Sequence, residues 1–303
     1  MPHLIKLYLN PEESSHRPVI LAELVSLVTA VKNVYSYQEN ERTYAEEKVL
    51  DAHRDQILGA FTSGLKVAST RKASIDGMLQ LVSIPHLLTE EEVGFVLHNV
   101  NELFDPAVDI DDIRCVAGQQ LRLCADICFS GPILDLLAAI SKASPKLVEE
   151  TTLPLLFSSL PDRAPNFEAT SERSAYQRTL KSLSTLCVQP ALFETLVIRL
   201  IAKLDLLCHL PDEVMLDENA RTCNAAYAHS ILVTLGNVID YKVDAKQPDV
   251  PRYMDRLVPR LFALFIEPAV SAERSFNPIT DDHRLIEVTG NIFASILRTV
   301  TAE

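Results

Sequence analysis

Glycine and aromatic residues are scarce in this sequence, and tryptophan is absent. Only 8 of the 303 residues are Gly, whereas 17 are Pro, and aromatic residues make up 6 %. Sheets and barrels need many glycine-containing turns, so this balance favours helices joined by proline-containing loops. Apolar residues make up 48 %, which is enough for a core and excludes disorder over most of the chain.

Basic residues are also in short supply. The chain has 28 Lys and Arg against 41 Asp and Glu, a formal net charge of -13. This charge repels the phosphate backbone of nucleic acids, and no dense basic run offsets the repulsion locally. We therefore expect no direct binding of nucleic acid, and we expect protein partners, of which basic ones are the easiest to accommodate.

Long apolar runs are missing as well. No stretch reaches about 18 uninterrupted apolar residues, the length that a membrane-spanning helix needs. The N-terminal residues Met1 to Leu7 lack the basic region and long apolar core of a signal peptide. The sequence therefore predicts an intracellular protein with no contact to a membrane.

A repeated pattern organises the chain. A Pro followed by apolar residues at helical spacing recurs in three segments, at residues 2–9, 153–160 and 258–265. Each copy reads as the later part of an amphipathic helix, and each runs into a polar, proline-containing loop. These loops are expected at Asn10 to His16, Pro161 to Thr170 and Glu267 to Thr280.

A second helix follows each of these loops. It opens at a basic residue, which is Arg17, Arg173 or Arg284. The recurring unit is therefore helix, loop, helix. Strands find little support, because alternating apolar and polar runs are short and lack Asn-Gly or Asp-Gly hairpin turns.

The segments between these copies follow the same order. A helix is predicted over Glu46 to Leu65, and the next one opens at Arg71. Thr89 and Glu92 form a capping-box pattern at the start of a third pair. The partner helix of that pair is expected to begin near Asp111, with acidic residues where the helix dipole favours them.

The clearest helical pattern spans Pro190 to Cys208. Proline stands at the favoured opening position, and one broad apolar stripe follows. The members of this stripe are Leu192, Phe193, Leu196, Val197, Leu200, Ile201, Leu204 and Leu207. The segment from Asn219 to Tyr241 supplies the partner helix.

The repetition predicts the fold class. A single helix pair cannot cover its own apolar face, whereas stacked pairs bury a continuous core. We predict an all-α fold, an alpha-alpha superhelix (solenoid) of HEAT repeats with about six helix pairs, in which residues 1–303 form one array. Pro2 directly follows Met1, so the front half of the first helix is missing. We expect the chain to be part of a longer array or the product of a shortened gene.

Two groups of cysteines are candidate chemical sites. The first contains Cys124 and Cys128, which are four residues apart, with Cys115 upstream. These thiols suggest a metal or cluster site, but their apolar surroundings favour packing in a core, and a second ligand pair is missing. The second group is Cys208, His209, Cys223 and His229. Its spacing matches no nucleophile motif, which again favours packing.

Charged clusters are the remaining candidates. Three acidic runs, at residues 90–92, 109–112 and 281–282, lie at predicted helix starts, where the helix dipole explains them better than catalysis or metal binding. Two interpretations are open for the basic residues Arg71, Lys72 and Arg173. They form a structural ladder of ion pairs with acids of a neighbouring repeat, or they contact a partner protein. The long loop Leu160 to Glu168 reads as a solvated insertion or as a docking segment.

No enzyme site emerges from these patterns. Neither glycine-rich phosphate-binding motif occurs, and no Ser or Cys sits in a strand-turn-helix elbow. We predict no catalytic, cofactor-binding or metal-binding residue and no cofactor, and the sequence identifies no individual partner-binding residue. The six cysteines suit a reducing compartment.

Several segments together resemble a known family. They are LPDRAP at 160–165, SERSAYQRTL at 171–180 and PALFETLV at 190–197, together with NPE at 10–12, HRPV at 16–19 and RKASIDGM at 71–78. This combination resembles the middle region of the HEAT-repeat family called methyl-methanesulfonate-sensitivity nineteen, in its fungal form. Members of that family are far longer arrays, and their docking surface for assembly partners lies towards the C-terminal end, which we expect this chain to lack.

The resemblance implies a specific function. The family is the adapter that presents clients to the cytosolic iron-sulfur protein assembly machinery. It works with a beta-propeller protein and a small targeting subunit, and it delivers clusters to DNA polymerases, helicases and repair proteins in the nucleus. A protein-binding adapter of DNA repair and transcription, in nucleus and cytoplasm, is therefore the expectation. The alternatives are another HEAT scaffold, such as a nuclear transport receptor, or an enzyme built on the cysteine and carboxylate clusters.

Overall fold

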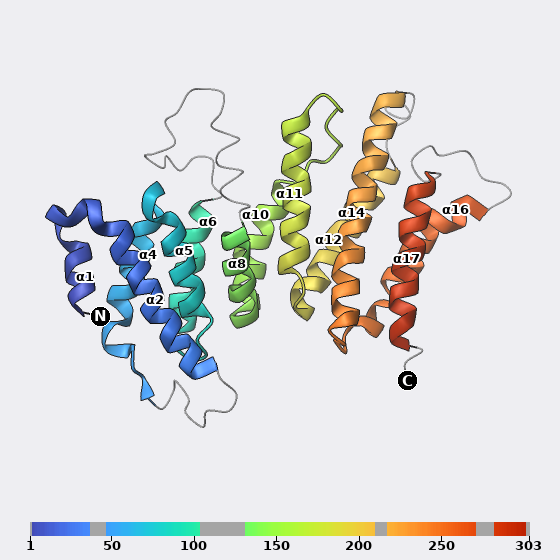
Figure 1. Cartoon of the computed structure of the whole chain (residues 1–303). Coiled ribbons are helices and arrows are strands. Elements are labelled where there is room, and N and C mark those ends of the chain that lie inside the picture. The colour runs from blue at the N-terminus through green and yellow to red at the C-terminus, as the bar shows by residue number, and fades with distance from the viewer. Residues whose placement is uncertain (1, 37–46, 104–130, 210–216, 271–281, 301–303) are drawn as a thin grey trace. The chain divides into compact units, whose positions relative to one another are not determined.

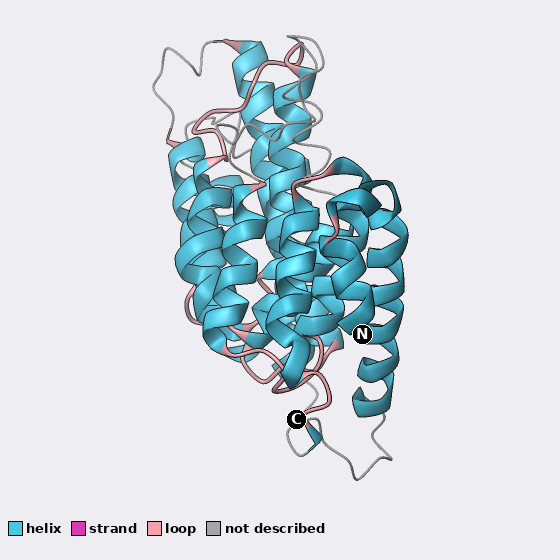
Figure 2. Ribbon diagram, turned by 90° about the vertical axis from the view of Figure 1, so that its left-hand side faces the viewer, coloured by secondary structure: helices cyan, strands magenta, loops and turns pink. Residues whose placement is uncertain are grey.

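A computed structural model describes residues 2–36, 47–103, 131–209, 217–270 and 282–300. Within these ranges every regular element is a helix and none is a strand (Figure 2). The prediction of an all-α fold is therefore confirmed for the described part of the chain. The residues group into two compact units, which we call unit 1 (Met1–Val148) and unit 2 (Glu149–Glu303).

Unit 1 consists of packed helix pairs. The first helices of the described pairs are α1 (Pro2–Leu9), α4 (Arg54–Leu65) and α6 (Glu90–Glu102). The second helices are α2 (Arg17–Ser36), α5 (Ala68–Val82) and α8 (Gly131–Ala143). Short elements complete the unit, namely η1 (Pro11–His16), η2 (Asp51–His53) and α9 (Pro145–Leu147). Helix α5 lies between α2 and α8 and packs against both, while α1 packs against α4 (Figure 1).

Two glycines allow α4 and α5 to pack closely. A Cβ atom on Gly77 of α5 would overlap the buried ring of Phe61 in α4. A Cβ atom on Gly64 of α4 would meet the side chains of Ser74 and Leu21. Since the missing side chains leave the space that the neighbouring groups fill, glycine is required at this helix contact.

Helix α2 forms most of the segment Ser14–Tyr35, which is long and apolar enough to cross a membrane by length and composition alone. Core helices pass the same test. One face of α2 is buried within unit 1 at Ile20, Leu21, Leu24 and Val28, where α1, α4 and α5 pack against it. The absence of membrane contact, which the sequence predicts, stays a prediction.

Unit 2 repeats the pairing of helices. The division between the units falls within the π-helical turn η3 (Val148–Thr152), and α10 (Leu153–Ser158) and α11 (Thr170–Leu186) follow. The pair α12 (Pro190–Cys208) and α14 (Glu218–Asp244) follows. The last pair joins η4 (Val250–Tyr253), α15 (Leu257–Leu261), η5 (Phe262–Ile266) and α16 (Glu267–Val270) to α17 (His283–Val300).

The helices of unit 2 form two layers. In one layer α14 lies between α11 and α17 and packs along both (Figure 1). In the other layer, polar side chains join neighbouring pairs. The hydroxyl of Thr195 in α12 donates to Glu149 Oε1 at 2.6 Å, and on the opposite side the guanidinium of Arg260 in α15 donates to Asp205 Oδ2 in α12 at 2.6 Å.

A buried ion pair holds the centre of unit 2. The side chain of Lys242 in α14 is fully buried, and its Nζ lies 2.7 Å from Asp249 Oδ2. The same Nζ donates to the Val188 carbonyl at 2.9 Å and to Gln247 Oε1 at 2.6 Å, and it stands 5.0 Å from the ring centroid of Phe193. Burial lowers the pKa of Lys242, whereas the hydrogen bond and the charge of Asp249 oppose that shift. The ammonium group of Lys242 thus joins Val188, in the segment after α11, to Gln247 and Asp249, in the segment after α14.

The helix boundaries agree with the sequence in some places and correct it in others. Helix α12 spans Pro190–Cys208 as predicted, and α14 extends the prediction by a few residues at its C-terminal end. The prediction of one helix over Glu46 to Leu65 is wrong, because α4 begins at Arg54 after a short 3-10 turn. Lys48 has a φ of 48°, a left-handed conformation that an α-helix does not accommodate.

Two of the predicted loops contain helical turns. The loop expected at Asn10 to His16 forms the 3-10 helix η1, in which the Asn10 side chain accepts from the Glu12 N–H. The loop expected at Glu267 to Thr280 starts with α16. The partner helix expected near Asp111 lies outside the described residues; α8 is the helix that packs against α6 in the described part of unit 1.

Candidate protein-binding surface

Helix α12 has more apolar surface than the core of unit 2 uses. Its inner face is buried, as the predicted stripe requires. However, Ile198 and Leu206 lie off that stripe and expose 60 % and 59 % of their surface. One face of this helix already packs in the core. The exposed aliphatic side chains therefore make its outer surface a candidate for binding another protein.

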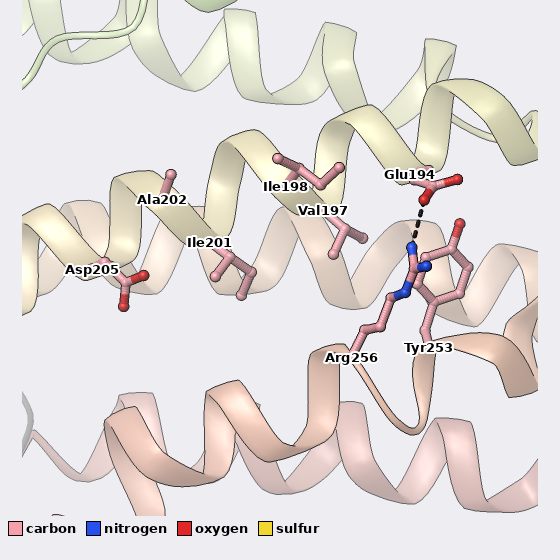
Figure 3. Close-up of a pocket in the computed structure, with 8 residues that line it drawn as sticks. All are labelled: Glu194, Val197, Ile198, Ile201, Ala202, Asp205, Tyr253 and Arg256. Carbon is pink, nitrogen blue, oxygen red and sulfur yellow. Dashed lines mark hydrogen bonds and ion pairs between the residues drawn. The ribbon is translucent and has the colours of Figure 1, made fainter.

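A groove runs between α12 and the segment that contains η4 and the start of α15 (Figure 3). We call it the α12 groove; it encloses about 280 Å³. Its lining consists of Glu194, Val197, Ile198, Ile201, Ala202, Asp205, Tyr253 and Arg256. The α12 residues recur every three or four positions, which places them along one side of the helix. The middle of the groove is aliphatic, and a carboxylate stands towards each end.

The two carboxylates have different surroundings. Glu194 is half exposed, and its Oε1 lies 2.5 Å from a guanidinium nitrogen of Arg256 (Figure 3). Asp205 is three-quarters buried; its Oδ2 is bound by Arg260, whereas its Oδ1 is buried and has no hydrogen-bond partner in the structure. Both carboxylates are therefore paired with an arginine, but Glu194 is largely solvated, whereas one oxygen of Asp205 is buried without a hydrogen bond.

Tyr253 forms part of the groove wall next to Glu194 (Figure 3). Its ring packs edge-on against Phe193, with the centroids 4.6 Å apart. Burial, followed by the charges of Asp249 and Glu194, raises the pKa of Tyr253 to about 12. The hydroxyl group therefore stays neutral at physiological pH, and the wall contributes a polar but uncharged atom.

The described cysteines lie in the core. Cys187, Cys208 and Cys223 are buried and are not part of disulfide bonds. Burial, reinforced by the charge of Asp205, raises the pKa of Cys208 to about 12; burial and Glu149 raise the pKa of Cys187 as well. Since the thiolate is the nucleophile and the metal ligand, these environments disfavour both kinds of chemistry.

The members of the predicted second cysteine group have different surroundings. Cys208 and Cys223 are both buried, while the ring Nδ1 of His209 lies 2.8 Å from the Asp205 carbonyl. Among the residues that the structure describes, no three His, Cys, Asp or Glu side chains are arranged to hold a metal ion. The first cysteine group, Cys115, Cys124 and Cys128, lies outside the described residues.

The described acidic runs lie at helix starts. Residues 90–92 form the first turn of α6, and the predicted capping box of Thr89 and Glu92 is present. Glu92 also forms an ion pair with Arg54 at 2.8 Å. Asp282 precedes α17, and its Oδ1 accepts the Arg284 backbone N–H at 3.0 Å. Residues 109–112 and Asp281 lie outside the described part of the chain.

The described contacts of Arg71 and Arg173 are with groups other than the acids of a neighbouring helix pair. Arg71 is buried, and its Nε donates to the Leu65 carbonyl at 2.9 Å within the α4–α5 turn. The guanidinium of Arg173 stands 4.7 Å from the ring centroid of Phe167. Ion pairs between neighbouring helix pairs in unit 2 come from other basic residues, which include Arg256, Arg260 and Arg298.

The loop from Leu160 to Glu168 is anchored at several points. The hydroxyl of Tyr227 in α14 donates to the Pro161 carbonyl at 3.1 Å, and the Ala164 N–H donates to Asn224 Oδ1 at 2.9 Å. The Nζ of Lys203 lies 2.7 Å from Asp162 Oδ1. The hydrogen bond from Lys203 and its positive charge lower the pKa of Asp162. The loop thus follows a fixed path over α12 and α14, while its role in docking stays a prediction.

In the part of the chain that the structure describes, these observations define helices that pack in pairs, with an aliphatic groove along α12 that has an ion pair towards each end. Residues 179–303, less than half of the chain, match the family model described as RNAPII transcription regulator C-terminal, MMS19_C. No curated protein and no solved structure matches the chain.

The resemblance predicted from the sequence is therefore confirmed, with one correction. The matching model describes the C-terminal region of the family, not the middle region. The matched residues lie entirely in unit 2 and include every residue that lines the α12 groove. The expectation that the C-terminal part of the family is missing from this chain is wrong for residues 179–303.

The α12 groove has little signature in the sequence. Ile198 carries the available signal, since it is aliphatic but falls outside the helical stripe that fills the core. The contact between Asp205 and Arg260 could not be predicted from the residues around either one. Fifty-five positions separate them, and their contact depends on how α12 and α15 pack.

Proposed function

We propose that this chain is a protein-binding scaffold of HEAT-type helix pairs that serves as an adapter in cytosolic iron-sulfur protein assembly. In this role it brings the assembly machinery to proteins of DNA repair, replication and transcription, and it works in both nucleus and cytoplasm. The observation that carries the proposal is the family match over residues 179–303. That match coincides with a region of stacked helix pairs.

The described structure supports a binding role rather than a catalytic one. The thiols of Cys187 and Cys208 are held protonated by burial, and the described acidic residues stabilise helix starts. The α12 groove, in contrast, offers aliphatic side chains and charged groups at its ends, which are the features of a surface that contacts another protein. Scaffolding needs such a surface and no reactive group.

The test is reconstitution with purified components. The full chain, carrying an affinity tag, is mixed with the beta-propeller and targeting subunits of the assembly complex and, separately, with an apo iron-sulfur helicase. We expect retention of at least one of these proteins at micromolar concentration. The GTPase Ran and a basic nuclear-localisation peptide serve as controls for the transport-receptor alternative.

The two outcomes separate the alternatives. If neither the assembly subunits nor the client is retained, the adapter function is wrong for this chain. If Ran or the basic peptide is retained instead, the chain is a transport receptor. Fluorescence microscopy of the tagged chain tests its location, because exclusion from the nucleus would contradict delivery to nuclear clients.

A further inference from the structure

Unit 1 contains a polar pocket where α1, α2, α4 and α5 pack against one another (Figure 1). We call it the Arg17 pocket; it encloses about 420 Å³. Its lining consists of Tyr8, Leu9, Ser14, Arg17, Ser63, Val67, Ser69 and Thr70. Most of these side chains carry a hydroxyl group, and among the lining residues Arg17 alone carries a charge. The pocket therefore has one cation and no carboxylate in its lining.

The guanidinium group of Arg17 forms no ion pair with the residues that the structure describes. Its central carbon stands 5.6 Å from the ring centroid of Tyr8, which covers one face of the group. The Nε atom is enclosed and has no hydrogen bond. The two terminal nitrogens also lack a hydrogen bond, but they are not enclosed as Nε is. These two nitrogens form a fork that an anion in the pocket can reach.

The first turn of α5 adds further donors to the same pocket. The residue that precedes this helix, Val67, provides no side-chain hydrogen bond to its first turn. Ser69 is exposed, and in the described structure neither its N–H nor its hydroxyl group forms a hydrogen bond. Free N–H groups and the helix dipole favour a negative charge at such a position. Both Arg17 and Ser69 thus supply unused donors to one pocket.

The remaining hydroxyl groups hold the wall of the pocket in place. The hydroxyls of Tyr8 and Ser63 are hydrogen-bonded to each other at 2.9 Å, and that of Ser63 also donates to the Ala60 carbonyl. The hydroxyl of Thr70 donates to the Gly64 carbonyl at 2.8 Å. Because these groups are already satisfied within the protein, the unused donors of Arg17 and Ser69 lie on a fixed frame.

These donors fit a single phosphate group. A guanidinium fork and a helix N-terminus both bind the tetrahedral oxygens of a phosphate monoester. The net charge of -13 disfavours polyanions such as nucleic acid or an anionic bilayer, which bring many phosphates at once. The pocket also has apolar surface, since Leu9 and Val67 expose 65 % and 45 % of their area. Free phosphate does not use that surface, whereas a phosphorylated residue with an apolar neighbour does.

We propose that the Arg17 pocket binds a phosphorylated Ser or Thr of a partner protein. The phosphate contacts Arg17 and Ser69, and an apolar residue next to it packs on Leu9 and Val67. The inference goes beyond the proposed adapter function and does not depend on it, because the pocket lies in unit 1, outside the residues 179–303 that match the family. Binding at this site depends on the phosphorylation state of the partner.

The probe is a short fluorescent peptide with a central phosphoserine and Leu on each side of it. Its control is the same peptide without the phosphate. Fluorescence anisotropy with the full chain measures both affinities, and we expect the phosphopeptide to bind at least about tenfold more tightly. Inorganic phosphate should displace the phosphopeptide, but only at higher concentrations than the unlabelled phosphopeptide needs, because it lacks the apolar contacts.

Three variants locate the binding. Arg17→Met keeps the stem that lies on Tyr8 and removes the charge, and we expect it to weaken phosphopeptide binding by more than about tenfold. Ser69→Asp should weaken it as strongly by repulsion, while a carboxylate in the first turn of a helix does not disturb folding. Lys72→Met is the matched control, since it removes the same charge from an exposed residue of α5 outside the pocket. No change in affinity is expected for it.

Four outcomes overturn the inference. They are equal binding of the two peptides, no binding at about 1 mM, equal loss in Arg17→Met and Lys72→Met, and unchanged binding in Ser69→Asp. Displacement by inorganic phosphate at the concentrations that the unlabelled phosphopeptide needs would contradict a site for a protein segment. A chain that retains the assembly subunits but does not distinguish the peptides keeps its adapter function and loses only this site.

Discussion

Units 1 and 2 share an organisation of helix pairs but are stabilised differently. In unit 1, the contact between α4 and α5 depends on two glycines, at which the helices approach until a Cβ atom no longer fits. In unit 2, the centre is a buried ammonium, that of Lys242, which binds a carboxylate and a backbone carbonyl. One unit therefore tolerates little added volume, whereas the other tolerates little loss of charge.

The polar contacts between neighbouring pairs follow the same division. Arg54 and Glu92 join α4 to α6 in unit 1, while in unit 2 ion pairs join α12 to the segment after it at both ends of the α12 groove. The residues that match the family model thus include both of these unit 2 ion pairs. The comparison teaches that ion pairs join neighbouring helix pairs in both units, whereas in unit 2 a charged pair also lies in the buried centre.

The largest expected effect comes from removing the buried charge of unit 2. Lys242→Met keeps the apolar stem but leaves Asp249 without its cation. Breaking a buried ion pair in this way costs about 3–5 kcal/mol of the free energy of unfolding. Urea denaturation followed by circular dichroism measures the loss, and hydrogen exchange shows which unit opens. The contrast with unit 1 fails if amides of unit 1 lose protection to the same extent.

A second variant separates the charge from the packing. Adding Asp249→Asn to Lys242→Met removes the uncompensated carboxylate, so we expect this double variant to recover part of the lost stability. If the double variant is as unstable as Lys242→Met alone, the loss comes from the shape of the site, and the description of unit 2 as held by charge is wrong.

The next effect tests the close packing in unit 1. Gly77→Ala places a methyl group against the ring of Phe61, which is buried and has little room to move. We expect a loss of about 1–3 kcal/mol in the free energy of unfolding. Gly59→Ala in the neighbouring helix is the matched control, since nothing lies within 4 Å of its Cβ position.

That control has the opposite expected sign. At Gly59 an alanine improves helix propensity without a clash, and the gain is about 0.5–1 kcal/mol. Equal effects of Gly59→Ala and Gly77→Ala, in either direction, would mean that backbone propensity and not the contact with Phe61 decides the stability of this helix pair.

A smaller effect concerns the start of α6 in unit 1. Thr89→Ala removes the hydroxyl that accepts the Glu92 N–H, while the Glu92 side chain keeps its bond to the Thr89 N–H and its ion pair with Arg54. Half of the capping box is lost, and we expect a loss of about 1 kcal/mol. Thermal unfolding measures it, and Thr89→Ser should retain most of the stability.

Much of the fold could be predicted from the sequence, because the residues that begin each helix and the apolar stripe along it indicate the same helix that packing stabilises. Pro190 and the apolar stripe after it define α12 from end to end, and the spacing of Thr89 and Glu92 identifies a helix start. These features depend on residues that are neighbours in the sequence. The break before Arg54 was missed because the left-handed conformation of Lys48 has no counterpart in the pattern of apolar residues.

The candidate site could be predicted only in part. Exposed aliphatic residues on α12 can be read from the helical period, but the unpartnered oxygen of Asp205 depends on which oxygen Arg260 reaches. Arg71 is a second example. Its position at a helix start suggested an ion pair with a neighbouring repeat, but its side chain donates a hydrogen bond to the Leu65 carbonyl in the α4–α5 turn. Long-range contacts decide the role of a charge, and a single sequence does not contain them.

The smallest expected effect distinguishes charge from hydrogen bonding at the start of α17 in unit 2. The hydrogen bonds and charge of Arg284 lower the pKa of Asp282 despite partial burial. A carboxyl group with a lowered pKa stabilises the fold above its unfolded pKa of about 3.9, and this contribution disappears as the pH falls through the folded pKa.

Asp282→Asn keeps an oxygen that can accept the Arg284 backbone N–H but removes the charge. We expect this variant to be less stable than the parent chain by about 0.5–1 kcal/mol at pH 7, since Arg284 is substantially exposed and the pair is screened. Chemical denaturation across a pH series is the measurement. The difference between the two proteins should shrink as the pH drops below 4; a difference that stays constant down to pH 2 would mean that geometry, and not the ionised carboxylate, stabilises this helix start.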